Sequence, residues 1–263
     1  MQEKVNLTYL QVKRFRKYYS NRYSALLYNL ELFYTYPEQE VLHKIRVELK
    51  KISTMFHLIH YCSVNFKSRK EFIDLKNIFR EAGKIREMQQ TFKLMLKYKI
   101  KRSLQKKIQD DEYDLTMNFR MKAGQFKKNI NDVYERTKNY SSKINSGNLS
   151  EFLMIRQLRL QDLISPEPDP DNLHNVRKVI KDIVYLSEIK YGKNNKIEPV
   201  FDEIQNLIGK WHDKQVMMKV LDEDRTAKHI RILDKLRTAC EMDICSLKNP
   251  ISAIQNKEFI QAD

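Results

Sequence analysis

Apolar residues recur at intervals of three and four along most of this chain. One run contains Val41, Ile45, Leu49, Ile52 and Phe56, the spacing that places apolar side chains on one face of an α-helix. Residues that interrupt helices are scarce, because the 263 residues include only 5 Gly and 6 Pro. Sandwiches, barrels and glycine-loop nucleotide-binding folds need many more turn residues. The sequence therefore predicts an all-α protein built from long helices.

This spacing and the positions of the helix breakers together predict eight helices. The expected ranges are 5–35, 38–64, 69–102, from the end of the acidic stretch 110–112 to about 144, 149–164, 171–191, 196–221 and 224–247. Residues 165–170 are the strongest linker, because three prolines within five residues cannot continue a helix. We expect two four-helix bundles, residues 1–145 and 146–248, and a C-terminal tail at 249–263.

Basic residues are concentrated in the first half of the chain. Of 49 Lys and Arg and 34 Asp and Glu, which give a net charge of +15, residues 1–145 hold 31 and 15, and residues 146–263 hold 18 and 19. Such an excess attracts polyanionic partners, although a basic surface that only maintains solubility has the same composition. Charge alone does not distinguish DNA, RNA, anionic lipid and inorganic phosphate polymers.

The sequence also predicts a compartment. No segment approaches the roughly 20 apolar residues that cross a bilayer, and the basic residues between 13 and 17 interrupt any signal-peptide core. The three cysteines, Cys62, Cys240 and Cys245, lack the spacing of a disulfide framework or a zinc knuckle. We therefore expect a cytoplasmic protein with free thiols and no membrane span.

Two short motifs each occur twice, in the same order. The first motif, His-x-x-Arg-x-x-x-Lys, has its polar members at His43, Arg46, Lys50, His174, Arg177 and Lys181. The second motif begins with Gly-Lys and covers residues 83–89 and 209–215. Its glycine follows the histidine of the first motif by 40 residues in one copy and by 35 in the other. This self-similarity predicts a duplicated four-helix unit.

The spacing of the first motif has a physical meaning. Positions i, i+3 and i+7 lie on one side of a helix, so each copy projects an imidazole, a guanidinium and an ammonium along one stripe. We call His43, Arg46 and Lys50 the first stripe and the corresponding residues of the second copy the second stripe. Like charges on one helix face repel by about 0.2–0.5 kcal/mol per pair. Acidic neighbours or an anionic ligand should offset this repulsion.

A pseudo-twofold arrangement would let the two stripes face each other. With Lys84 and Lys210 they would then line one basic groove or channel. Arginine binds phosphate oxygens with two parallel hydrogen bonds, whereas lysine acts as a mobile point charge. The residues thus favour a ligand that carries many phosphate groups.

Other chemistries find less support. Glu40-x-x-His43 and Asp171-x-x-His174 formally resemble the Glu-x-x-His pattern of di-iron bundles, but the next turns place cations beside the hypothetical metal. Neither a nucleophile elbow nor a phosphate-binding glycine loop occurs, so we expect no cofactor and no enzymatic activity. Tyrosines of the first helix could stack on bases, although tyrosine at helical spacing more often packs with its hydroxyl in contact with water.

The motifs resemble those of the CHAD domain (conserved histidine α-helical domain), from about residue 5 to 247. Residues 43–51 are close to the family pattern HxxRVxxRR, and residues 174–188 resemble HxxRKxxKRLRYxxE. Residues 83–87 and 209–213 look like the acidic-ended helix motifs of the same family. Each motif alone is weak, but four in the same order make the resemblance specific.

The resemblance implies two four-helix bundles related by pseudo-twofold symmetry around a basic central cavity. It also implies binding of inorganic polyphosphate without catalysis, in bacteria at polyphosphate granules. The implied binding residues are His43, Arg46, Lys50, Lys51, Lys84, His174, Arg177, Lys178, Lys181 and Lys210. Ser53, Asp182 and Val184 stand where the family has further basic residues, so we expect the first half to dominate the affinity. The alternative is a helical RNA- or DNA-binding module that uses the basic first half.

Overall fold

The computed structural model describes residues 2–165, 169–192, 199–223 and 226–255, and side chains there except those of residues 2–12 and 227. Within these ranges every regular element is helical, which confirms the predicted all-α class. None of the described helices is both long enough and apolar enough to cross a membrane. Residues 166–168 of the predicted linker, and the first residues of the helix expected at 196–221, lie outside the described ranges.

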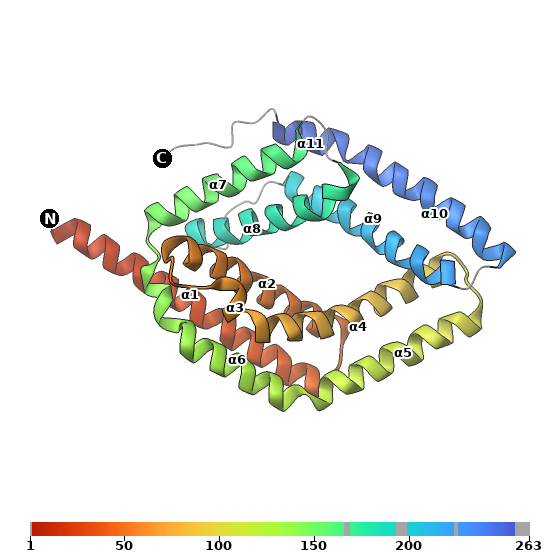
Figure 1. Cartoon of the computed structure of the whole chain (residues 1–263), viewed down its shortest axis with the longest axis horizontal. Helices are drawn as coiled ribbons and strands as arrows, with labels where there is room; N and C mark the ends of the chain where they lie inside the picture. Colours follow the sequence, from red (N-terminus) through yellow and green to blue (C-terminus); the bar gives the residue numbers. More distant parts are fainter. Residues whose placement is uncertain (1, 166–168, 193–198, 224–225, 256–263) are drawn as a thin grey trace. The chain divides into compact units, whose positions relative to one another are not determined.

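Most predicted helices occur within a few residues of their expected positions (Figure 1). Short 3₁₀ helices lie at Lys138–Lys143 and Pro170–Asn172. The α-helices, in chain order, are α1 (Gln2–Thr35), α2 (Gln39–Cys62), α3 (Ser68–Glu71), α4 (Ile73–Lys97), α5 (Arg102–Met121), α6 (Ala123–Thr137), α7 (Ser146–Ile164), α8 (Leu173–Tyr191), α9 (Pro199–Glu223), α10 (Ala227–Ser246) and α11 (Lys248–Gln255).

The packing divides the chain into two compact units. Unit 1 comprises Met1–Arg86, Asp110–Phe152 and Glu188–Lys193, and unit 2 comprises Glu87–Gln109, Leu153–Ser187 and Asn194–Asp263. Helices α4, α5, α7 and α8 therefore contribute residues to both units. The predicted boundary at residue 145 follows the sequence repeat, whereas this division follows packing, so the two duplicated four-helix halves stay a prediction.

This division changes how the charge is distributed. Unit 1 carries 26 Lys and Arg against 16 Asp and Glu, and unit 2 carries 23 against 18. The net charges are thus +10 and +5, a much smaller difference than between the two halves of the sequence. The change arises because the basic segment around the α4–α5 turn packs in unit 2 although it belongs to the first half of the chain.

In unit 1, α1 and α2 pack against each other, and aromatic rings fill the space beside them. The rings of Phe33 and Phe119 meet edge to face, with 5.5 Å between their centroids. Phe56 and Phe66 meet in the same way at 5.1 Å. The apolar face of α2 that the sequence predicts is therefore the buried face, which leaves its polar stripe for other contacts.

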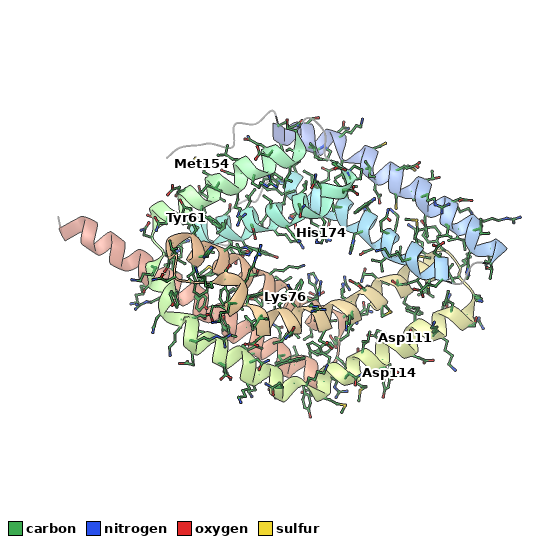
Figure 2. All side chains as sticks on the ribbon, in the orientation of Figure 1. Tyr61, Lys76, Asp111, Asp114, Met154 and His174 are labelled. Carbon is green, nitrogen blue, oxygen red and sulfur yellow. The ribbon has the colours of Figure 1, made fainter. Side chains whose placement is uncertain are left out.

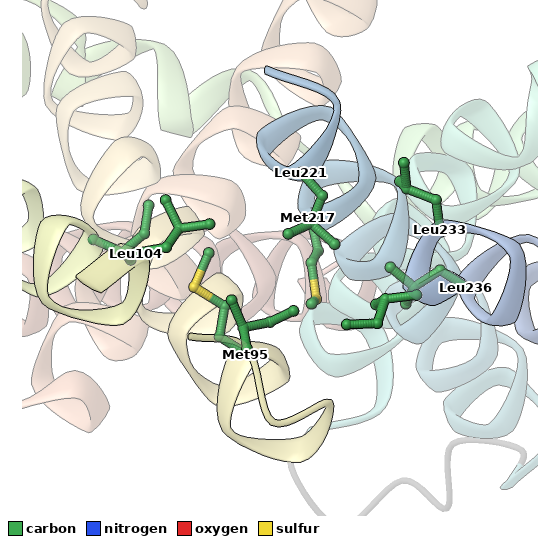
Figure 3. Close-up of a cluster of buried hydrophobic side chains, with 9 residues drawn as sticks. Met95, Leu104, Met217, Leu221, Leu233 and Leu236 are labelled. Carbon is green, nitrogen blue, oxygen red and sulfur yellow. The ribbon is translucent and has the colours of Figure 1, made fainter. Parts of the chain in front are cut away.

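In unit 2, an apolar cluster joins the end of α4 and the start of α5 to α9 and α10 (Figure 3). Every member is almost completely buried. The cluster consists of Met95, Ile100, Leu104, Ile108, Met217, Leu221, Ile232, Leu233 and Leu236. It anchors the α4–α5 turn within unit 2.

This turn corrects the predicted helix boundaries. The helix expected at 69–102 ends at Lys97, and α5 begins at Arg102 and runs straight through the acidic stretch 110–112. The predicted break at 110–112 is wrong because these residues are mostly exposed on the helix surface, where solvated charges do not interrupt a helix. A further break that the sequence analysis missed separates α5 from α6 at Lys122.

The true break is a Schellman motif with an unusual residue. Lys99 has a φ of 51°, in the left-handed region that glycine usually occupies. The N–H of Ile100 donates to the carbonyl of Met95 over 3.0 Å, and the N–H of Lys99 donates to that of Leu96 over 3.2 Å. Ile100 and Met95 are both buried, as this motif requires. The sequence does not predict this turn, because a lysine stands where glycine usually marks the end of a helix.

The C-terminal segment also differs from the prediction. Where a tail was expected, α11 follows α10 almost directly. Pro250 lies in the first turn of α11, where a proline loses no intrahelical hydrogen bond. Ile251 and Ile254 are buried, and Nε2 of Gln255 donates to the carbonyl of Ile164 over 2.7 Å. Burial of the two isoleucines stabilises the short helix.

Tyrosines of α1 form a buried hydroxyl chain. The hydroxyls of Tyr19 and Tyr23 are 3.2 Å apart, and that of Tyr19 lies 2.5 Å from Oγ1 of Thr137. Thr137 in turn donates to the carbonyl of Val133 over 2.5 Å. The packing of Tyr19 and Tyr23 is thus confirmed, but their hydroxyls are buried, whereas contact with water was predicted. Burial raises the pKa of Tyr19 to about 12, although its hydrogen bond to Thr137 opposes the shift.

The raised pKa predicts a loss of stability at alkaline pH. In the unfolded chain tyrosine ionises near pH 10, so the contribution of Tyr19 is complete below pH 10 and lost between pH 10 and about 12. The loss should be roughly 2–3 kcal/mol of unfolding free energy. Urea unfolding should therefore show a shallower pH dependence in Tyr19→Phe than in the wild type. Exposed Tyr28→Phe is the control, and parallel curves for Tyr19→Phe and wild type would contradict the expectation.

The left-handed lysine predicts a stabilising substitution. Lys99→Gly should raise the unfolding free energy by about 0.5–1 kcal/mol, because glycine adopts a positive φ without steric cost. Lys93→Gly, in the interior of α4, should lower it by about 1 kcal/mol. Urea denaturation of both variants measures the difference. A destabilised Lys99→Gly would show that the positive φ carries no strain.

Candidate polyanion-binding site

The first stripe is turned toward α4. His43 is exposed, whereas Arg46 and Lys50 are half-buried. The guanidinium carbon of Arg46 lies 4.3 Å from the centroid of the Phe79 ring, and Nζ of Lys50 lies 5.7 Å from it. Nη1 of Arg46 also donates to the carbonyl of Phe79 over 2.9 Å. One residue of α4 therefore holds two cations of the stripe.

Gly83, one helical turn beyond Phe79, makes room for this guanidinium. A Cβ atom built on Gly83 would lie 2.8 Å from Nη1 of Arg46. Real Cβ contacts are essentially never that short, so any other residue at Gly83 would displace the arginine. The two sequence motifs, 40 residues apart, thus meet in unit 1.

The second stripe repeats the contact between arginine and glycine in unit 2. Figure 2 labels the histidine of this stripe, His174. His174 is exposed, and Arg177 and Lys181 are half-buried on α8. A Cβ atom on Gly209 of α9 would lie 3.0 Å from Nη2 of Arg177. In each unit, therefore, the arginine of the first motif lies against the glycine of the second.

The second stripe contains an incompletely compensated guanidinium. Nε of Arg177 is buried and has no hydrogen-bond partner among the described residues. Burial lowers the pKa of Arg177 below its ordinary value, and the carboxylate of Asp213 opposes that shift. The guanidinium has already lost part of its hydration, so a bound anion would meet a smaller remaining desolvation cost. The rings of His174 and His212 lie 6.1 Å apart beside it.

Lys51 occupies a different environment from the stripes. Its Nζ lies 2.8 Å from Oε2 of Glu188, and both side chains are less than 15% exposed (13% and 14%). Asp182, which takes the place of Lys51 in the second copy of the motif, lies 3.6 Å from Arg156. Both positions therefore have a partner of opposite charge, although the two partners come from different helices. The sequence analysis identified neither partnership, because helix periodicity does not reveal contacts between helices.

The other lysines predicted to bind ligand lie at the surface. Lys178 and Lys210 are exposed on α8 and α9. Lys84 is 56% exposed, and its Nζ lies 3.9 Å from the Glu81 carboxylate. Ligand contacts by all predicted residues stay predictions, and the ammonium of Lys51 is already engaged by the mostly buried carboxylate of Glu188.

In the described part of the chain, no group of three or more His, Cys, Asp or Glu side chains is arranged to hold a metal ion. Cys240 is buried, Cys62 is half-buried and Cys245 is exposed. Burial raises the pKa of Cys62 and of Cys240, which keeps both thiols protonated near neutral pH.

The Lys51–Glu188 pair predicts a stability effect. Lys51→Met should lower the unfolding free energy by roughly 1–3 kcal/mol, because Glu188 would be left mostly buried without this partner. Removing both charges in Lys51→Met/Glu188→Met should restore much of the loss. Lys84→Met, which removes an exposed lysine, should change stability by less than about 0.5 kcal/mol. Equal effects of Lys51→Met and Lys84→Met in urea unfolding would contradict the structural role.

Comparisons with known proteins address the fold. No family model matches the sequence, and no curated protein matches it. The crystal structure of the CHAD domain from the plant Ricinus communis is similar, with a TM-score of 0.69 and 13% sequence identity. The match covers 92% of this chain and 91% of that one. This likeness confirms the fold that the sequence motifs suggested: the chain has a CHAD-like, all-α fold.

Proposed function

We propose that this protein binds inorganic polyphosphate, without transforming it, through the stripes of α2 and α8. One observation carries the proposal: in each unit a half-buried arginine is held against a glycine, between a histidine and a lysine of the same helix face. A row of three cationic or donor groups suits a ligand with repeating phosphate oxygens.

Each group of a stripe would contribute differently. Arg46 and Arg177 would make bidentate, charge-assisted hydrogen bonds with phosphate oxygens. Lys50 and Lys181 would act as point charges that follow the ligand. The exposed imidazoles of His43 and His174 can donate when neutral, and a bound polyanion raises their pKa. Affinity should therefore increase as the pH falls through the ordinary histidine range and level off below it.

The proposal includes the predicted groove, cytoplasmic location and association with polyphosphate granules. A polyphosphate chain that engages several cationic groups makes linked binding steps, so affinity should rise with chain length. Release of counterions makes affinity fall steeply with salt. No cofactor is required for this kind of binding.

Nucleic-acid binding is the second candidate, and a specific surface favours it. We call residues 93–107 the basic hairpin, since they join α4 to α5 and no acidic residue occurs between 88 and 109. Nζ of Lys228 on α10 donates to the carbonyl of Lys99 in its turn over 3.0 Å. Backbone phosphates of RNA or DNA bind such surfaces without sequence preference. Its exposed cations are Lys93, Lys97, Lys99, Lys101, Arg102, Lys106 and Lys107.

Titration with polyphosphates of graded length, at several salt concentrations, tests the proposal. Arg46→Ala and Arg177→Ala should each weaken binding roughly 10- to 100-fold, because each removes charge-assisted hydrogen bonds worth about 1.5–3 kcal/mol. The salt dependence should become shallower in both variants. Circular dichroism should show unchanged helix content. Unchanged affinity in both arginine variants would rule out the stripes as the binding site.

A matched variant separates the two candidates. Lys97→Gln/Lys106→Gln removes two exposed cations of the basic hairpin and should leave polyphosphate affinity nearly unchanged. Long-chain polyphosphate should also displace labelled RNA at equal phosphate concentration. If the hairpin variant loses both ligands while the arginine variants keep them, the basic hairpin is the binding surface. Phosphate release from polyphosphate with Mg²⁺ would favour a phosphohydrolase, and we expect none.

A further inference from the structure

Two glycines stand inside long helices although alanine would be the better helix former. We propose that Gly83 and Gly209 are positioning residues, each of which fixes the phosphate-binding arginine of its unit by lacking a Cβ atom. The identity of the ligand in this inference rests on the proposed function. The coupling between glycine and arginine does not, because it can be measured in the protein without ligand.

The other glycines of the chain have different surroundings. The sequence contains 5 Gly. A Cβ on Gly124, in the first turn of α6, would meet nothing within 4 Å, and one on Gly147 would meet only the side chain of Asn145. Gly192 follows α8 and has a φ of 90°. The two mid-helix glycines, in contrast, both face a guanidinium.

The two contacts differ in how much room they leave. At Gly83 the distance of 2.8 Å allows no Cβ unless Arg46 moves. That movement would disturb the hydrogen bond from Arg46 to Phe79 and the contact of the guanidinium with the Phe79 ring. At Gly209 the distance of 3.0 Å requires a shift of a few tenths of an ångström. Arginine is flexible, so in both cases the guanidinium moves and the helix stays intact.

A guanidinium held in this way is prepared for its ligand. One side of it lies against the helix that carries the glycine, so the remaining donors have a restricted set of directions. Because the rotamers of this side chain are already restricted, binding costs less conformational entropy. Displacing the guanidinium should therefore lower affinity even though its charge remains.

Double-mutant cycles test this inference. Gly83→Ala should lower polyphosphate affinity about tenfold, which corresponds to about 1.4 kcal/mol, and should have no effect in the Arg46→Ala background. Gly209→Ala should behave in the same way with Arg177→Ala, with a smaller loss because its clearance is larger. Gly124→Ala is the control for a glycine-to-alanine change without a neighbour and should leave affinity unchanged.

Urea unfolding without ligand completes the test. Gly83→Ala should raise the unfolding midpoint in the Arg46→Ala background, where only the gain in helix propensity remains, and should raise it less or not at all beside Arg46. Equal shifts in both backgrounds would overturn the packing argument. Undiminished polyphosphate affinity in both glycine variants, beside weakened arginine variants, would overturn the positioning role. A wild-type protein that binds no polyphosphate would refute the proposed function instead, and the urea cycle would still decide the coupling.

Discussion

In both units the candidate site depends on one contact. A charged side chain lies directly against the backbone of a neighbouring helix. Arg46 and Arg177 can lie there because Gly83 and Gly209 have no Cβ. The arginine belongs to the helix with the histidine and the lysine, and the glycine to the next long helix of the same unit. A single missing carbon thus links two motifs that are far apart in the sequence. It also restricts a flexible side chain that would otherwise sample many rotamers.

Packing decides which of the cations in the sequence remain available to a ligand. The excess of cations in the first half of the chain is divided between the units, because α4 and α5 carry the basic hairpin into unit 2. Lys51 is compensated by Glu188 inside unit 1, whereas the buried Nε of Arg177 has no hydrogen-bond partner within the part of the chain that the structure describes. Affinity for a polyanion should therefore depend on which cations remain available, and the net charge of a half is a poor guide to it.

The helices were predictable where their boundaries follow chemical rules that act locally. The apolar face of α2 followed from the interval of three and four, and the residues expected on it are all buried, together with others such as Met55 and Leu58. The turn at Lys99 was not predictable, because its left-handed backbone is maintained by burial of Ile100 and Met95 in a cluster completed by α9 and α10. Likewise α11 was not predicted: Pro250 is tolerated in its first turn, but the burial of Ile251 and Ile254 that stabilises this helix appears only in the tertiary structure.

The sequence by itself determined the helical class, the repeated motifs and the residue types that share each stripe. The residues that share a helix face follow from the geometry of a single helix, and this geometry is the same in any environment. Only the tertiary structure decided that each arginine meets a glycine, that Lys51 pairs with Glu188 and that the basic hairpin packs in unit 2. Such contacts join residues far apart in the chain. They depend on which helix faces pack together, and periodicity within one helix does not specify its neighbours.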